Sequence, residues 1–138
     1  MDEQIEVWNI FHDGTIVEVR GELPNISLRI EIPYLREMFP GAGHSFWAHI
    51  VDCKTCQYSN WRGKEITVLA EIMGEEPEIL DVSQIGNMAH IVCVNGSLDL
   101  KYAEISFELD SGVPVSINEL DKVCRTYWDE WGKRSKRT

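Results

Sequence analysis

The sequence predicts an α+β domain, a mostly antiparallel β-sheet with a C-terminal amphipathic helix packed on one face. Three observations predict this class. Residues 27–32 alternate apolar and polar side chains, as a strand with one buried face does. Two apolar stretches flank Asn95-Gly96, a dipeptide typical of hairpin turns. Ser116 and Glu119 form an S-x-x-E capping box at the start of a helical apolar stripe.

The first part of the chain is predicted to form three strands. Residues 5–11 have the composition of a strand, and residues 12–14 (His-Asp-Gly) supply turn chemistry. Residues 15–20 alternate as a second strand, and the glycine and proline within residues 21–24 interrupt it. Residues 27–32 form the third strand, with its leucine and isoleucines on one face.

The middle of the chain is less regular. Residues 33–44 contain two prolines and two glycines, which is typical of a loop with room for one helical turn at 34–38. Residues 46–53 return to strand composition. Residues 66–73 fit helical spacing and strand alternation equally well, and we favour one short central helix. Residues 78–82 are expected to be extended.

A hairpin is predicted around residues 95–96, with residues 88–94 and 97–109 as its arms. Asparagine and glycine tolerate positive φ, so we expect a type I′ turn. The apolar side chains change parity midway along the second arm. One extra residue would restore their facing, so we predict a β-bulge near residues 103–104.

The last helix is predicted to carry an apolar stripe. Its members are Ile117, Leu120, Cys124, Tyr127, Trp128 and Trp131. The three aromatic residues are interpreted as core, with a ligand platform or partner contact as the alternative. Gly132 is a natural helix end, so we predict one α+β domain over residues 1–131 and a basic flexible tail over residues 132–138.

The charge of the chain restricts its partners. The formal net charge is −10, and residues 1–131 carry nine basic against 23 acidic side chains, a net charge of −14. Such a surface repels phosphate backbones and anionic lipid and attracts a basic protein. No apolar run is long enough to span a bilayer, and the first residues are acidic. We therefore expect a cytoplasmic protein with neither a membrane nor a nucleic acid as its partner.

The densest group of ligand-type residues is His44, His49, Cys53 and Cys56, with His90, Cys93 and Cys124 more distant. One C-x-x-C is half a zinc site. On a strand, His49 and Cys53 lie about 13 Å apart, too far to share one ion. We interpret the two cysteines as reduced thiols, with zinc as the alternative. A thioredoxin-type site needs a helix after the first cysteine, and residues 57–61 give no helix signal.

Two further motifs contain residue types that catalytic sites use. The pair His12-Asp13 invites comparison with metal-dependent phosphohydrolases, but those place such a pair on helices, and here we expect a turn at a strand end. Ser45 follows a Gly-rich loop, yet that loop does not connect a strand to a helix as a nucleophile or phosphate loop does. We therefore assign no catalytic residue, no metal ligand and no cofactor.

Both ends of the chain carry a resemblance. The Phe-His-Asp-Gly sequence at residues 11–14 before an alternating strand, and Tyr127-Trp128 on a terminal helix, resemble small β-rich bacterial proteins, some of them predicted immunity proteins of polymorphic toxin systems. The resemblance implies a β-rich cytoplasmic protein with no established active site. The pair Cys53/Cys56 and the basic tail have no counterpart in it.

These observations lead to three functional hypotheses. The first is a non-enzymatic binding protein, an acidic immunity-type inhibitor of a basic protein, since association with a basic partner gains rate from electrostatic steering. The second is a small metal-dependent hydrolase, in which His12, Asp13 and the His/Cys group would converge on one pocket. The third is a structural homodimer paired along an exposed edge strand at residues 27–32. A monomer and a homodimer both remain open.

Overall fold

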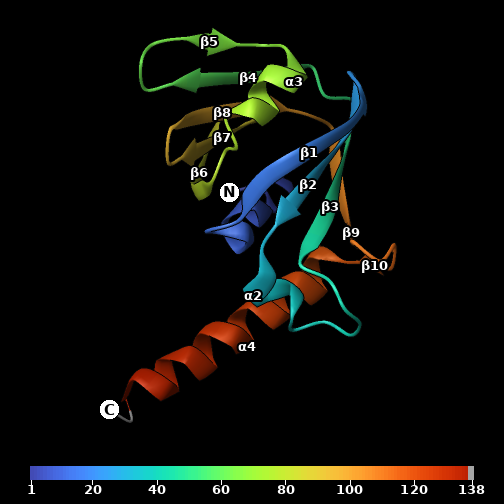
Figure 1. The fold of residues 1–138 in the computed structure, drawn as a ribbon, viewed down its shortest axis with the longest axis vertical. Coiled ribbons are helices and arrows are strands. Elements are labelled where there is room, and N and C mark those ends of the chain that lie inside the picture. Colours follow the sequence, from blue (N-terminus) through green and yellow to red (C-terminus); the bar gives the residue numbers. More distant parts are fainter. Residues whose placement is uncertain (137–138) are drawn as a thin grey trace.

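The structure, a computed structural model, describes the backbone of residues 1–136 and the side chains of residues 1–133. Within this range the predicted α+β class is confirmed, but the strands form two five-stranded antiparallel sheets where the sequence predicts one (Figure 1). Sheet A has the order β1-β2-β3-β9-β10, with β1 Thr15–Glu22, β2 Asn25–Glu31, β3 Ser45–Val51, β9 Glu104–Leu109 and β10 Pro114–Val115. Sheet B has the order β5-β4-β8-β7-β6, with β4 Thr55–Asn60, β5 Glu65–Ile66, β6 Ile79–Ile85, β7 Met88–Cys93 and β8 Gly96–Lys101.

Short helical segments connect and cover the two sheets. They are α1 Glu3–Glu6, the 3-10 helix η1 Val7–Phe11, α2 Pro33–Arg36, α3 Leu69–Gly74 and the long C-terminal helix α4 Ile117–Lys136. Both the helical turn expected after Pro33 and the short central helix are confirmed. No helix between residues 1 and 136 has the length and apolar character needed to cross a membrane.

The predicted edge strand is not an edge. β2 lies between β1 and β3 and pairs with both along its length. The break expected at residues 21–24 comes later, because β1 continues through Gly21, whose φ of 85° suits glycine, to Glu22. A homodimer paired along β2 is therefore wrong, since its backbone hydrogen bonds are already made within sheet A.

The N-terminal segment was predicted as a strand and is helical instead. The side chain of Asp2 accepts a hydrogen bond from the amide of Gln4 (2.8 Å) and caps α1, and η1 continues directly from it. Ile5, Trp8 and Phe11 are all buried, and their spacing of three residues matches a 3-10 helix better than a strand. The composition of this segment misled the prediction, because the apolar residues that favour strands also occur on the buried face of a helix.

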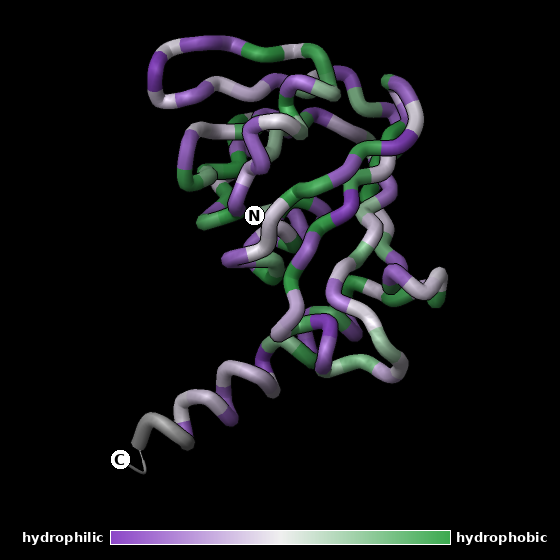
Figure 2. Tube along the Cα trace, viewed as in Figure 1, coloured by the Kyte–Doolittle hydropathy of each residue, from purple (hydrophilic) through white to green (hydrophobic). Residues whose placement is uncertain are grey.

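This segment fills the core between the sheets. One cluster of buried side chains includes residues of both sheets, of the N-terminal segment and Leu120 of α4. The ring of Phe11 stacks on Phe107 of sheet A at 5.1 Å and meets Phe46 edge-on at 5.5 Å. The indole of Trp8 donates a hydrogen bond to the Tyr102 hydroxyl (2.9 Å), which satisfies its one buried polar atom. In Figure 2 hydrophobic residues alternate with hydrophilic ones along the strands.

The predicted β-bulge at residues 103–104 is wrong. β8 ends at Lys101 in sheet B, and β9 begins at Glu104 in sheet A, so the chain crosses from one sheet to the other at this point. The apolar side chains change parity because the two strands face the shared core from opposite sides. The irregularities that interrupt strand register occur instead between Ile16 and Glu18 and between Ile79 and Asp81.

The hairpin at residues 95–96 is confirmed, but its turn type is not. β7 and β8 pair on either side of it, yet neither Asn95 nor Gly96 has positive φ. Glycine is required at 96 for a different reason. A Cβ there would lie 2.7 Å from the ring of Tyr58, whose buried hydroxyl packs against this backbone.

The start of the C-terminal helix is predicted correctly from the sequence, but its end is not. The capping box is present, because the Glu119 amide donates to Ser116 Oγ (3.1 Å) and the Ser116 amide donates to the Glu119 carboxylate (3.2 Å). Gly132, however, does not end the helix, which continues to Lys136. An interior glycine costs a helix about 1 kcal/mol, which does not suffice to stop it. Part of the predicted flexible tail is thus helical, and residues 137–138 lie outside the described residues.

Replacing Ser116 with alanine is expected to lower the free energy of unfolding by about 1 kcal/mol, because the Glu119 amide loses its acceptor. Urea unfolding followed by circular dichroism measures this loss. Glu119→Gln is the matched control and should cost less than about 0.5 kcal/mol, since glutamine also completes a capping box. Equal losses in the two variants would show that the side chain of Ser116 does not cap the helix.

Candidate functional site

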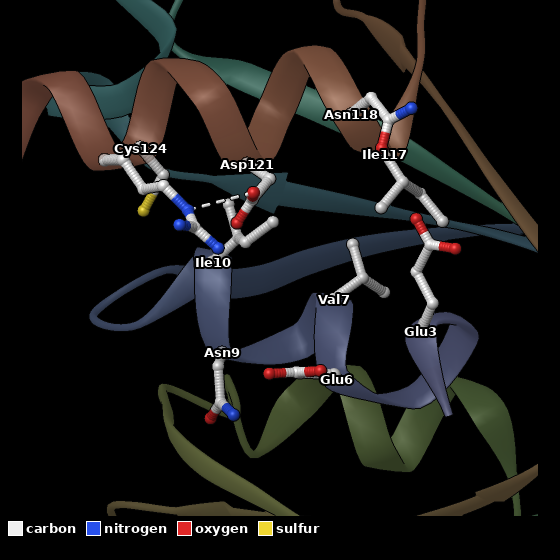
Figure 3. A pocket seen from close by; sticks show the side chains of 10 residues that line it. Glu3, Glu6, Val7, Asn9, Ile10, Ile117, Asn118, Asp121 and Cys124 are labelled. Atoms are coloured by element: carbon white, nitrogen blue, oxygen red, sulfur yellow. Dashed lines mark ion pairs between the residues drawn. The ribbon is translucent and has the colours of Figure 1, made fainter. Parts of the chain in front are cut away.

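An acidic groove separates the N-terminal segment from α4. It encloses about 320 Å³ and is lined by residues that include Glu3, Glu6, Val7, Ile10, Ile117 and Asp121. Figure 3 shows Val7 and Ile10 directed from the N-terminal segment toward α4, and Ile117 and Asp121 directed from α4 toward them. The groove therefore has an apolar floor with carboxylates around it. We refer to it below as the acidic groove.

The carboxylates of the acidic groove are available to a partner. Glu3 and Glu6 are exposed, and neither forms an ion pair with any side chain of residues 1–133. Among the described side chains that line the groove, Arg125 is the one cation, and Asp121 holds it from one helical turn away, with Nε 3.0 Å from a carboxylate oxygen. An apolar floor next to unneutralised carboxylates suits a basic, partly apolar surface rather than an anionic ligand.

The thiols of the chain are poorly suited to nucleophilic or redox chemistry. Burial raises the pKa of Cys56 to about 12 and that of Cys93 to about 12. Burial likewise raises the pKa of Cys53, and that of Cys124, which lines the acidic groove. Because the thiolate is the reactive form, these cysteines are expected to remain protonated near neutral pH. Cys53 Sγ donates instead to the Thr55 carbonyl at 3.3 Å.

The four histidines occupy four separate places. His12 contacts the Leu80 carbonyl through Nδ1 (2.6 Å) beside the N-terminal turn, and His44 lies 3.7 Å from Asp110. His49 is on sheet A, and His90 on sheet B pairs with Asp99 at 2.6 Å. Within the described part of the chain no three His, Cys, Asp or Glu residues are grouped as a metal would require. The convergence that the hydrolase hypothesis needs is not found among these residues.

A Ser-His-Glu network does cross the outer face of sheet A. A hydrogen bond of 2.7 Å joins Ser27 Oγ to His49 Nδ1, and His49 Nε2 lies 3.0 Å from Glu108 Oε1. A hydrolase would also need backbone amides free to stabilise an oxyanion. The amides beside Ser27 belong to an interior strand and are committed to the pairing of β2 with β1 and β3. We interpret the network as cross-strand pairing on the wet face.

Among the ion pairs formed by side chains of residues 1–133, the most buried one holds the loop between α2 and β3. The guanidinium of Arg36 donates to Asp110 (2.8 Å) and to four successive backbone carbonyls between residues 39 and 42. Asp110 also accepts from the amides of His44 and Ser45 and from the Ser45 hydroxyl. Burial by itself raises the pKa of Asp110, but Arg36 and these amides outweigh it and lower that pKa to about 2. Ser45 therefore has a structural partner and is not poised as a nucleophile.

Trp128 and Trp131 of α4 are exposed and Tyr127 is half-buried, which corrects their interpretation as core. Figure 1 shows the second half of α4 extending away from both sheets. Trp131 is 53% exposed and Trp128 is 39% exposed. Their neighbour on the body is Tyr34 of α2, whose ring lies 4.8 Å from Tyr127 and 6.0 Å from Trp128. Exposed tryptophans at this density are typical of interaction surfaces.

Sequence reasoning missed the acidic groove. Its two sides are separated by more than 100 residues, and the prediction of a strand over residues 5–11 hid the first side. The available signal was the spacing of Glu3 and Glu6, which share a helical face after the capping residue Asp2. Comparison of the chain with protein-family models, with curated proteins and with solved structures finds no match.

Proposed function

We propose that this protein is a non-enzymatic binding protein that inhibits a basic protein, as immunity-type proteins do, and that the acidic groove contacts this partner. The observation that carries the proposal is the groove itself, where Glu3 and Glu6 carry unneutralised charge beside an apolar floor. A basic side chain with an aliphatic stem satisfies both features, because lysine and arginine bury their methylenes while keeping the charge at a carboxylate.

The charge of the whole body supports the same conclusion. A net charge of −14 over residues 1–131 creates a long-range field that attracts a cationic partner and speeds association. Steering of this kind weakens with salt, because the Debye length is only about 10 Å at 0.1 M. Local contacts in the groove are less screened. The two contributions can therefore be separated by variants that change charge at different places.

The test captures a basic protein from lysate and compares its binding to two double variants that change the net charge of the chain by the same amount. The full chain is immobilised through its C-terminus, which leaves the N-terminal segment free. It is expected to bind a basic protein from native lysate at low salt and to release it at high salt. Glu3→Gln/Glu6→Gln is expected to weaken binding of that protein about tenfold, because both groove carboxylates lose their charge. Titration calorimetry with the purified partner measures the change.

Glu65→Gln/Glu104→Gln is the matched control. Both residues are exposed and belong to β5 and β9, outside the acidic groove, and the double change alters net charge by the same amount. It should slow association slightly and leave the dissociation rate unchanged. If both double variants lose equal affinity, the groove is not the contact. If no salt-sensitive partner is captured, the proposed function is wrong.

A further inference from the structure

A second pocket lies between α2 and the exposed half of α4. It encloses about 360 Å³ and is lined by Tyr34, Glu37, Met38, Tyr127, Glu130 and Trp131. Three aromatic rings, one thioether and two carboxylates make up this lining. We refer to it as the aromatic pocket. It shares no residue with the acidic groove.

The aromatic wall of this pocket is held in place from the body of the protein. The hydroxyl of Tyr34 donates to the His12 carbonyl (2.6 Å), and burial raises the pKa of this hydroxyl above its ordinary value, so that it stays a donor. Tyr127 packs on Tyr34, and Trp131 packs on Trp128 at 5.8 Å. The rings thus support one another while much of Trp131 remains in water.

The carboxylates give the pocket its preference for a cation. Glu37 and Glu130 are both exposed, and no side chain of residues 1–133 forms an ion pair with either of them. Aromatic faces carry negative potential and attract cations, and a neighbouring carboxylate adds to that attraction. An anion would be repelled by both components, and a purely apolar ligand would leave the carboxylates desolvated.

The same chain already shows which cation such a combination holds. On sheet A the guanidinium of Arg20 lies 4.2 Å from the centre of the Trp47 ring, and Glu18 accepts from its Nε at 3.0 Å. The aromatic pocket presents the ring and carboxylates of this arrangement without an arginine among the described side chains lining it. A guanidinium is planar, weakly hydrated and able to stack on a ring while its edge donates to carboxylates, which an ammonium does less well.

We infer that the aromatic pocket receives an arginine side chain of the basic protein partner. The inference rests on the proposed function for the source of the arginine, but the pocket can be tested without that partner. Stacking on Tyr127 and Trp131 and donation to Glu37 and Glu130 would anchor the partner on α4, beyond the acidic groove. Aromatic and arginine pairs of this kind dominate the energetics of protein interfaces.

The experiment titrates the full chain with N-acetyl-arginine amide and follows the five tryptophan indole resonances by ¹H–¹⁵N NMR. The Trp131 resonance should shift and saturate in the millimolar range, while those of Trp8 and Trp61 stay in place as internal controls. N-acetyl-citrulline amide, which has the same shape without the charge, should bind at least about fivefold more weakly. N-acetyl-lysine amide should also bind more weakly.

Two variants test the two components of the pocket. Trp131→Leu and Glu37→Gln/Glu130→Gln should each weaken binding of the arginine probe about fivefold, read from the remaining indoles and from calorimetry. All three positions are exposed, so the variants are expected to fold. Trp61→Leu and Glu65→Gln/Glu104→Gln are the controls and should leave the affinity unchanged.

Three outcomes would overturn the inference. Equal binding of arginine and citrulline probes would make the pocket a neutral site, and unchanged affinity in Trp131→Leu would place the probe elsewhere. A Trp131 shift that depends on protein concentration alone would mean that a second copy of the chain covers the pocket. None of these outcomes changes the result expected for Glu3→Gln/Glu6→Gln. Conversely, failure to capture a basic partner does not change the result of the probe titration. Failure of this inference and failure of the proposed function are therefore distinguishable.

Discussion

Replacing Arg36 with methionine is expected to reduce the free energy of unfolding by about 3–5 kcal/mol. The side chain of Arg36 is 0% exposed, and methionine fills similar space without any donor. Asp110 would then keep a charge that is only 17% exposed and has lost its main partner. The carbonyls of residues 39–42 would lose their common donor as well. Urea unfolding at neutral pH measures the loss.

Arg125→Met is the matched control, because it removes the same residue type from a pair of nearly the same length. Arg125 Nε lies 3.0 Å from Asp121, against 2.8 Å for Arg36 and Asp110, but Arg125 is 77% exposed. This variant should cost less than about 0.5 kcal/mol. Similar small costs in both variants would mean that water replaces the buried guanidinium, and the account of the loop would then be wrong.

The Arg36 cluster also bears on the proposed interaction surface. α2 presents Tyr34 to the aromatic pocket, while Arg36, two residues later, fixes the loop that follows. Glu37 and Met38 follow Arg36 directly, just before the carbonyls that it holds, and line the same pocket. A polar cluster buried within the body thus positions side chains that a partner would contact, which links the stability of this loop to binding.

The parts of the fold that could be predicted from the sequence depend on local chemistry. Alternation over residues 27–32 identifies β2 because successive side chains of a strand point to opposite faces, whatever the strand packs against. The capping box identifies the start of α4 because Ser116 and Glu119 satisfy each other's amides. Neither inference requires knowledge of what the element packs against.

The parts that could not be predicted depend on distant partners. The segment Val7–Phe11 is rich in residues that favour strands, and only its burial between two sheets selects a 3-10 helix. The parity change before β9 has two explanations in sequence, a bulge or a change of sheet, and pairing with β3 decides between them. Nothing local distinguishes the two.

The same limit applied to the candidate site. Asp110 meets Arg36 across 74 positions in sequence, and the acidic groove joins the first and last helices. The acidic balance of the chain was visible from composition, but its location was not. Gly132 illustrates the opposite error, because a strong local signal for a helix end was outweighed by the helix-forming residues around it.

Acid is expected to remove about 2 kcal/mol of stability through Asp110 alone. Burial would raise the pKa of this carboxyl, yet Arg36 and the amides of His44 and Ser45 lower it to about 2 from an ordinary value of 3.8. The unfolded chain therefore binds the proton first as pH falls, so stability is complete above the ordinary pKa and is lost between about pH 5 and pH 2. A shift of nearly two units corresponds to the stated free energy.

Comparison with Asp110→Asn isolates this contribution, because every other carboxylate titrates in both proteins. Urea unfolding of both proteins across this pH range should show the native protein's advantage over Asp110→Asn shrinking by about 2 kcal/mol as the carboxylate is protonated. Glu18, whose pKa is also lowered by Arg20 and Arg29 against the effect of burial, contributes equally to both curves. An advantage that stays constant from pH 5 downward would mean that Asp110 titrates alike in the folded and unfolded chains. In that case Arg36 would not hold it as a charged partner, and the loss expected for Arg36→Met would have to come from packing and from the loop carbonyls instead.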